Sequence, residues 1–189
     1  MPKVIDKRTA ILNNALDLLV ENGFHNTPMS SISKEAGVSA GIIYHYFDSK
    51  EALILELYRE IKTKFMALLF AGEPHKLESI EAMAQIWLNA YHFYVSHPKE
   101  TLFLEQFENS PYAKMCVHEF EDKFKPILEW IEVQMNNGKI LNLPFDVLND
   151  LTFGVALALA KKQIAGTVQV DDALLNQVVK AVQRSIQPE

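Results

Sequence analysis

The stretch 27–50 constrains the fold most, because two short segments in it each begin with a helix-capping signal. Thr27 precedes a proline, and a threonine cap followed by proline is typical of the first turn of a helix. Gly37 suits the left-handed backbone that ends many helices, and Ser39 can cap a second helix over residues 40–46. The pattern therefore predicts two short helices joined by a tight turn.

Apolar side chains at helical spacing give these two segments a shared core. The positions are Ile32, Ala36, Val38, Ile43 and Phe47. A short turn brings them together and crosses the helices steeply, which is the helix-turn-helix geometry. The second helix keeps a face that this core does not need, with small residues first and aromatic and polar residues after them. Such a face suits contact with the phosphates and base edges of a duplex.

The same stretch resembles a known family. Residues 36–53 read Ala-Gly-Val-Ser-x-Gly-x-x-Tyr-x-Tyr-Phe-x-Ser-Lys-Glu-x-Leu, which is similar to the signature of TetR-family transcriptional regulators. Upstream positions that agree at the expected spacing are Gly23, Phe24, Thr27 and Ile32. The resemblance ends near residue 60. One departure is Ser33, where the family usually has alanine, and serine is small enough to keep the packing.

The resemblance implies that the second short helix contacts DNA. The positions that match the family's DNA contacts are Thr27, Ser39, Ala40, Gly41, Tyr44, His45, Tyr46 and Lys50. Physical chemistry agrees, because the N–H groups of a helix start can hold a phosphate and groove-facing side chains can read bases. Core packing is the alternative for Tyr44 and Tyr46. A metal-binding His45 is disfavoured, because no partner ligand lies at a usable spacing.

The formal net charge of −6 is unfavourable for a DNA-binding protein, but the charge is unevenly distributed. Residues 1–64 hold 8 Lys+Arg and 8 Asp+Glu, net 0, whereas residues 65–189 hold 10 and 16, net −6. The cations that flank the binding elements are Lys3, Lys7, Arg8, Lys34 and Lys50. Placement matters more than the sum, and we expect weak, salt-sensitive binding to random DNA.

Helical periodicity continues along the rest of the chain. The predicted helices cover residues 6–22, 49–70, 79–96, 99–108, 112–137 and 145–164, with a last helix starting at Asp171 or Asp172. Pro126 either kinks its helix or marks a second start. The sequence therefore predicts an all-α protein of about nine helices. Residues 1–50 form a three-helix DNA-binding domain, 49–70 a connecting helix, and 71–189 a larger regulatory and dimerisation domain.

Aromatic and sulfur-containing residues at helical spacing run through the second domain. The candidates to line a pocket are Met83, Trp87, Tyr91, Tyr94, Phe103, Phe107, Cys116, Phe120 and Trp130. Such residues usually form core, but the resemblance to ligand-responsive regulators implies a cavity for an apolar or aromatic small molecule. Glu105, Glu108 and Glu119 are suited to a cationic ligand, although a solvated acidic surface is the favoured interpretation.

The last two helices are the expected subunit contact, paired with their copies as a four-helix bundle. The predicted interface residues are Leu148, Leu151, Val155, Leu159, Leu175, Val178, Val179 and Val182. A recognition helix of seven residues is only ~10 Å long, so specificity requires two copies on a pseudo-palindromic operator. The predicted partners are a double-stranded DNA operator, a second copy of the chain and a small-molecule effector.

Other classes of protein find little support. The single Cys116 excludes an internal disulfide, no apolar run approaches the ~20 residues that span a bilayer, and no signal-peptide pattern opens the chain, so we expect a cytoplasmic protein. No catalytic, metal or cofactor motif occurs. The predicted function is repression relieved by a ligand. The alternatives are an activator or corepressor-dependent regulator, or a helical ligand-binding protein or enzyme that no longer binds DNA.

Overall fold

The computed structural model describes residues 6–73, 81–116 and 119–188. Within these ranges the regular structure is helical and no strand occurs. Counted with α8, η3 and α9 as one unbroken helix, the described residues form nine α-helices, in agreement with the predicted all-α fold. The chain divides into two compact units, Met1–Thr63 with Lys99–Val117 and Lys64–Pro98 with His118–Glu189.

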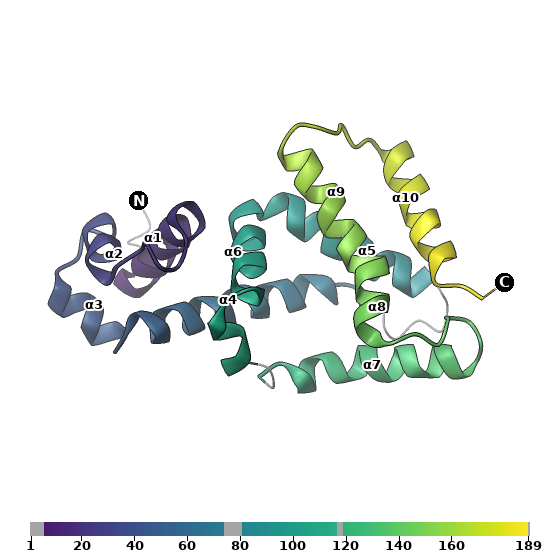
Figure 1. Cartoon of the computed structure of the whole chain (residues 1–189), viewed down its shortest axis with the longest axis horizontal. Coiled ribbons are helices and arrows are strands. Elements are labelled where there is room, and N and C mark those ends of the chain that lie inside the picture. Colours follow the sequence, from purple (N-terminus) through teal and green to yellow (C-terminus); the bar gives the residue numbers. More distant parts are fainter. Residues whose placement is uncertain (1–5, 74–80, 117–118, 189) are drawn as a thin grey trace. The chain divides into compact units, whose positions relative to one another are not determined.

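The first unit is built around the three front helices. It contains α1 (Lys7–Asn22), α2 (Met29–Glu35), α3 (Ala40–Tyr46) and the first part of α4 (Lys50–Leu69), which lie in succession in Figure 1. Nearly all of α6 (Pro98–Glu108) and the 3-10 helix η2 (Pro111–Met115) belong to it as well. Its fully buried apolar side chains are Ile11, Leu12, Ala15, Leu19, Ile32, Ile43, Leu53, Ile54, Phe103 and Phe107.

The turn between α2 and α3 has the predicted capping geometry. Gly37 has φ +64°, and the N–H of Val38 donates to Ser33 O at 2.9 Å. Ser39 Oγ accepts from the N–H of Ile42 at 3.3 Å and so caps α3. Ser33 is buried, but its Oγ donates to Ser30 O at 3.0 Å, so the hydroxyl at this crossing is satisfied.

Helix α6 packs on the front helices through aromatic rings. Phe107 stacks on Tyr58 of α4 with ring centroids 4.0 Å apart, and Phe103 lies 5.6 Å from Phe24. Gln106 Nε2 donates to Val20 O at 3.1 Å. Residues 99–116 therefore pack with the front helices, although the sequence suggested one domain over 71–189. The functions assigned to residues 1–50 and 71–189 stay predictions, because the boundaries of a compact unit need not be the boundaries of a functional domain.

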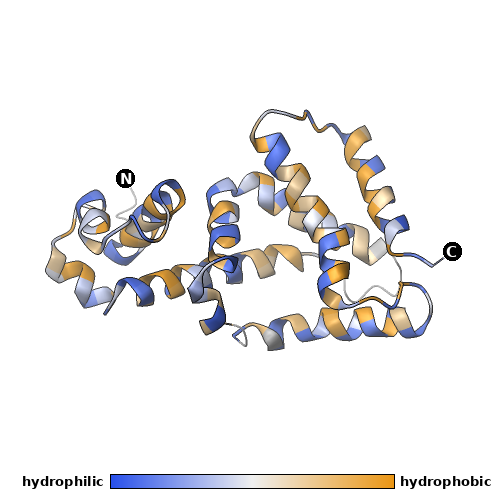
Figure 2. Ribbon diagram, viewed as in Figure 1, coloured by the Kyte–Doolittle hydropathy of each residue, from blue (hydrophilic) through white to orange (hydrophobic). Residues whose placement is uncertain are grey.

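The second unit contains α5 (Glu81–Ser96), α7 (Glu121–Asn136), α8 (Phe145–Asn149), the π-helical turn η3 (Asp150–Gly154), α9 (Val155–Ile164) and α10 (Asp172–Ser185). Helices α9 and α10 both pack on α5. Their shared core consists of Trp87, Tyr91, Ala156, Ala160, Val179 and Val182. Hydrophobic and hydrophilic residues alternate around α10 in Figure 2, which matches its amphipathic sequence.

The structure corrects one predicted helix and refines another. Residues 112–137 do not form a single helix, because η2 ends at Met115 and α7 begins at Glu121; Pro126 lies inside α7 and marks no second start. The predicted helix over 145–164 is continuous but contains η3, where Trp87 Nε1 donates to Thr152 O at 2.9 Å. The start predicted at residue 79 lies outside the described residues.

Candidate functional site

Helix α3 has one buried and one exposed face. Ile43 is 1% exposed and anchors the helix, whereas Tyr44 is 53% and Tyr46 37% exposed. Ala40, Gly41 and His45 are exposed as well, and the His45 ring lies edge-on to Tyr46 with centroids 5.4 Å apart. Core packing of the two tyrosines is therefore wrong. The short helix presents small residues at its start and three rings at its end.

Thr27 does not have the environment that the sequence suggested. It is 1% exposed, and its Oγ1 donates to Gly23 O at 2.9 Å and to Leu18 O at 3.1 Å. The cap residue of α2 is Pro28, without a side-chain cap hydrogen bond. The carbonyl groups at the end of α1 attract the hydroxyl more effectively than the start of α2. The buried Thr27 side chain thus connects the start of α2 to the end of α1, and its hydroxyl is not exposed to DNA.

Lys50 is also engaged within the first unit. Its Nζ donates a hydrogen bond to Phe24 O, and partial burial lowers the pKa of its ammonium group. The cap of α4 is Ser49, whose Oγ accepts from the N–H of Ala52 at 3.0 Å. Lys50 therefore ties the start of α4 to the segment between α1 and α2, a role that the sequence did not predict.

The cations that flank the motif divide into engaged and exposed groups. Arg8 forms ion pairs with Glu56 and Glu60 of α4, and the hydrogen bond to Glu60 is the main cause that raises the pKa of its guanidinium. Lys7 and Lys34 are exposed. Lys3 lies outside the described residues. Helical periodicity does not show which cation pairs with which carboxylate. However, Glu56 and Glu60 are four residues apart, so they lie on one face of α4 and can share a cation.

Gly41 has no steric reason within the chain to be glycine. A Cβ built there would meet nothing closer than Ser39 Oγ at 4.0 Å, and the residue is helical. We expect Gly41→Ala to stabilise the protein by up to ~1 kcal/mol through helix propensity, yet to weaken DNA binding by about tenfold, which corresponds to a loss of ~1.4 kcal/mol summed over the two recognition helices of a dimer. Thermal unfolding and DNA titration measure the two effects.

Gly154→Ala is the matched control for Gly41→Ala. Its Cβ would make only ordinary contacts, the shortest 3.8 Å to Asn149 O, and the residue lies in η3 of the second unit. The control should leave DNA affinity unchanged. If Gly41→Ala bound DNA as tightly as the parent protein, the close approach of the α3 backbone to DNA would be disproved.

The residues predicted to line a pocket are mostly packed. Met83, Trp87, Tyr91, Tyr94, Phe120 and Trp130 lie in the second unit, and Phe103, Phe107 and Cys116 in the first. All are buried except the half-buried Tyr94. The Trp87 and Tyr91 rings stack with centroids 5.7 Å apart, and the Tyr91 hydroxyl donates to Gln163 Oε1. Each residue thus has a packing role, and a ligand cavity lined by this set stays a prediction.

Helix α7 carries an unusual polar residue on its buried face. Ile127, Trp130, Ile131 and Gln134 recur at spacings of three and four and are 4–8% exposed. Among the side chains that the structure describes, Gln134 Oε1 is the buried polar atom without a hydrogen-bond partner. An unsatisfied buried acceptor costs about 1–3 kcal/mol. A ligand with an apolar body and a hydrogen-bond donor would satisfy it.

We therefore expect Gln134→Met to stabilise the ligand-free protein. Removal of a penalty of ~1 kcal/mol should raise Tm by about 2–4 °C in a chain of this size. Gln163→Met is the control, because Gln163 Oε1 accepts from Tyr91 and its loss should lower Tm. Differential scanning calorimetry compares the two. Equal destabilisation by both substitutions would show that Gln134 is already satisfied.

Three of the residues predicted for the subunit contact are buried within the chain itself. Leu148, Val179 and Val182 are 2–8% exposed, and the two valines pack on α5 within the same chain. Leu151, Leu159, Leu175 and Val178 are half-buried, and Val155 is 36% exposed. A stripe of apolar residues shows which face is buried but does not show whether the chain itself or a second copy covers it.

Comparison with known proteins agrees with this arrangement. The family described as "Bacterial regulatory proteins, tetR family" matches residues 11–57, and that described as "Tetracyclin repressor-like, C-terminal domain" matches residues 80–187. An HTH-type transcriptional regulator of Haemophilus influenzae is 27% identical over 90% of both chains. The fatty acid metabolism regulator protein of Bacillus subtilis is 32% identical, over 42% of this chain and 41% of its own length.

A solved structure shares the whole fold. The crystal structure of a TetR family transcription regulator from Marinobacter aquaeolei superposes with a TM-score of 0.89 over 97% of this chain and 96% of the other, at 19% identity. A buried helix-turn-helix core with an exposed α3 defines a DNA-binding transcriptional regulator. The chain belongs to the TetR family.

Proposed function

We propose that the protein is a ligand-responsive repressor that binds a pseudo-palindromic operator as a homodimer and is released by a small molecule. The observation that carries the proposal is the exposed face of α3. Its proposed DNA contacts are Ser39, Ala40, Gly41, Tyr44, His45 and Tyr46. Thr27 and Lys50 are left out, because their side chains are engaged within the chain. The protein would act in the cytoplasm, as a regulator and not as an enzyme.

Different residues along α3 would contact the phosphate backbone and the base edges of the duplex. The small residues at its start allow the backbone to approach the duplex, and the Tyr44 and Tyr46 hydroxyls can donate to phosphate oxygens. His45 offers a ring nitrogen to base edges. With only Lys7 and Lys34 exposed among the described cations near the motif, binding to random DNA should be weak at physiological salt. Paired half-sites would supply the affinity.

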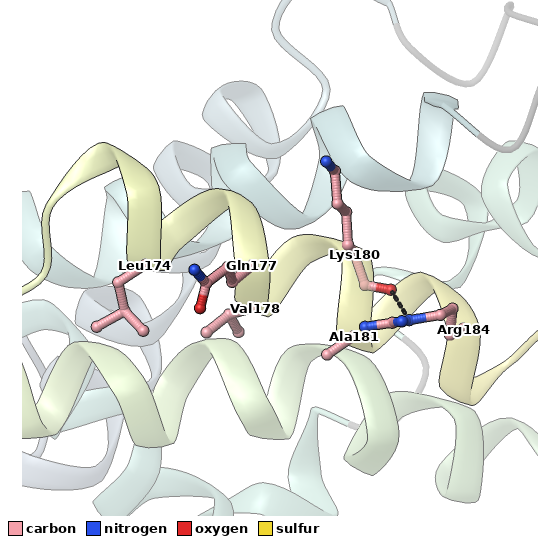
Figure 3. A pocket seen from close by; sticks show the side chains of 6 residues that line it. All are labelled: Leu174, Gln177, Val178, Lys180, Ala181 and Arg184. Atoms are coloured by element: carbon pink, nitrogen blue, oxygen red, sulfur yellow. Dashed lines mark hydrogen bonds between the residues drawn. The ribbon is translucent and has the colours of Figure 1, made fainter.

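The proposed dimer contact uses the outer face of α10. An open groove of about 500 Å³ is lined by Leu174, Gln177, Val178, Lys180, Ala181 and Arg184. Figure 3 shows Leu174, Val178 and Ala181 on one side of the helix, with Arg184 Nε donating to Lys180 O. An open groove along a helix, lined by apolar and polar side chains in equal number, suits a second helix. We assign it to the α10 of a second copy.

Charges along α10 support a two-fold axis through its middle. The helix begins with Asp171 and Asp172 and carries Lys180 and Arg184 near its end. In an antiparallel pair, the acidic start of each copy faces the basic end of the other. Exposed Val155 and Ala158 of α9 would extend this surface. The proposed interface thus leaves out the buried Leu148, Val179 and Val182 and uses the groove of α10 with Val155 and Ala158 instead.

The proposed switch depends on how the chain alternates between the units. Helix α5 belongs to the second unit, and the chain enters the first at Lys99, so nearly all of α6 packs with the DNA-binding helices. Its stack on Tyr58 reaches α4, which itself continues into the second unit. An effector that changes the conformation of the second unit would change the spacing of the two recognition helices in the proposed dimer. A coupling of ~1–3 kcal/mol changes DNA affinity by roughly 5–150-fold.

Selection from a pool of random duplexes tests the proposal. A repressor dimer should enrich a sequence with dyad symmetry, whose genomic matches overlap promoters. Transcription from such a promoter in a purified system, with and without the protein, then decides between a repressor and an activator. Compounds that raise the Tm of the protein should release it from the enriched duplex. Enrichment of no dyad would favour a helical ligand-binding protein, and a bound compound without effect on DNA affinity would reject the switch for that compound.

A further inference from the structure

The first turn of α1 carries a cation that is fully engaged within the first unit. Arg8 Nη1 donates to Glu60 Oε1 and Nη2 to Glu56 Oε1, each at 2.5 Å. The two glutamates lie one turn apart on α4, so one planar guanidinium spans both carboxylates. Glu56 also pairs with Arg59, with 3.5 Å between Oε2 and Nη1. Two positive and two negative charges thus balance within this cluster.

Arg8 also contacts the residue that ends the recognition helix. Its Cζ lies 5.9 Å from the centroid of the Phe47 ring, within the range of a cation–π contact. Phe47 is 4% exposed, follows α3 as its C-cap residue and donates its N–H to Ile43 O at 3.0 Å. One side chain of α1 therefore contacts both α4 and the end of α3.

We propose that Arg8 is a positioning residue for DNA recognition, which holds the angle between α3 and α4 by joining Glu56 and Glu60 to the Phe47 ring. Arg8 acts by fixing the position of α3, and it makes no direct contact with the DNA phosphates. Arginine is required, because a lysine ammonium is a single point charge and does not span two carboxylates and a ring. The inference depends on DNA binding by this family and on no effector.

Three single variants test this role in the full-length protein. Arg8→Gln should weaken binding to the enriched operator by about two- to fivefold, the range given by loss of an exposed ion pair, and should keep the parent salt dependence. Arg8→Lys should fail to restore operator affinity. Lys7→Gln is the charge-matched control, because it removes an exposed cation from the neighbouring position. Each variant is titrated with operator and with random duplex at several salt concentrations.

The salt dependence separates positioning from direct contact. Loss of a phosphate contact lowers the slope of log K against log salt by about 0.9 for each contact. If Arg8→Gln lowered this slope, weakened random and operator binding alike, or was fully rescued by Arg8→Lys, Arg8 would be a phosphate contact and the proposal would be overturned. Unchanged operator affinity in Arg8→Gln would overturn it as well.

Thermal unfolding of the protein without DNA tests the Arg8 contacts independently of the operator. A double-mutant cycle in thermal unfolding with Arg8→Gln and Glu60→Gln should be non-additive, because the two groups share one interaction. Additive effects would show that the ion pair does not hold α1 to α4, and they would contradict the proposal even if selection enriched no duplex. If Arg8→Gln did not fold, Arg8→Met, which also removes the positive charge, would replace it in the same cycle.

Discussion

Replacing Ala181 with arginine is expected to convert the protein into a monomer that binds its operator at least about 100-fold more weakly, because the avidity of two linked half-sites is lost. Ala181 is exposed and lines the groove of α10, so an isolated subunit accommodates the larger side chain. Arginine is a good helix former. In an isologous dimer whose two-fold axis passes through the middle of α10, both substitutions place a bulky charge inside the contact close to the axis, and burying an unpaired charge opposes association.

Asn176→Arg is the matched control for this experiment. Asn176 is an exposed residue of the same helix, but it does not line the groove. Sedimentation equilibrium should report a dimer for the control and a monomer for Ala181→Arg, and circular dichroism should report the same helix content for both. A dimeric Ala181→Arg protein with parent affinity would exclude this groove as the subunit contact.

Local signals in the sequence were sufficient to predict the recognition helix. Gly37 and Ser39 set the ends of the turn, and the structure places α3 at Ala40–Tyr46 as predicted. The reason is physical: a left-handed glycine and a serine cap act within four residues of chain. The exposed face of α3 followed from the same pattern, since Ile43 alone among its central residues is needed by the core.

Non-local contacts explain what the sequence did not reveal. The Thr27 hydroxyl bonds to carbonyl groups at the end of α1, and the Lys50 ammonium to Phe24 O, so the side chains of two expected DNA contacts are engaged within the chain. Val179 fell on a predicted apolar stripe, yet α5 of the same chain covers it. Periodicity ran through residues 112–137, whereas the structure separates η2 from α7. A pattern identifies a buried face but not its partner.

Substitution of Tyr44 by alanine is expected to weaken operator binding by roughly 100-fold without unfolding the protein. The side chain is 53% exposed, so its removal creates no cavity in the core. A hydroxyl donating to a charged phosphate contributes about 1.5–3 kcal/mol. The proposed dimer would make two such contacts, and a total of ~3 kcal/mol corresponds to about 100-fold in affinity.

The Tyr44→Phe variant separates the hydroxyl from the ring. If the hydroxyl makes the phosphate contact, Tyr44→Phe should lose nearly as much operator affinity as Tyr44→Ala. If instead the ring packs on the sugar or bases, Tyr44→Phe should keep most of the parent affinity. Titration of the operator with all three proteins distinguishes these cases, and thermal unfolding monitors the fold. Parent-like affinity of Tyr44→Ala would remove this exposed ring of α3 from the DNA interface, and a large loss of helical signal would assign it to the core. Because Tyr44 and Gly41 are three residues apart on one helix face, loss of affinity in both variants would define a single surface that the duplex contacts.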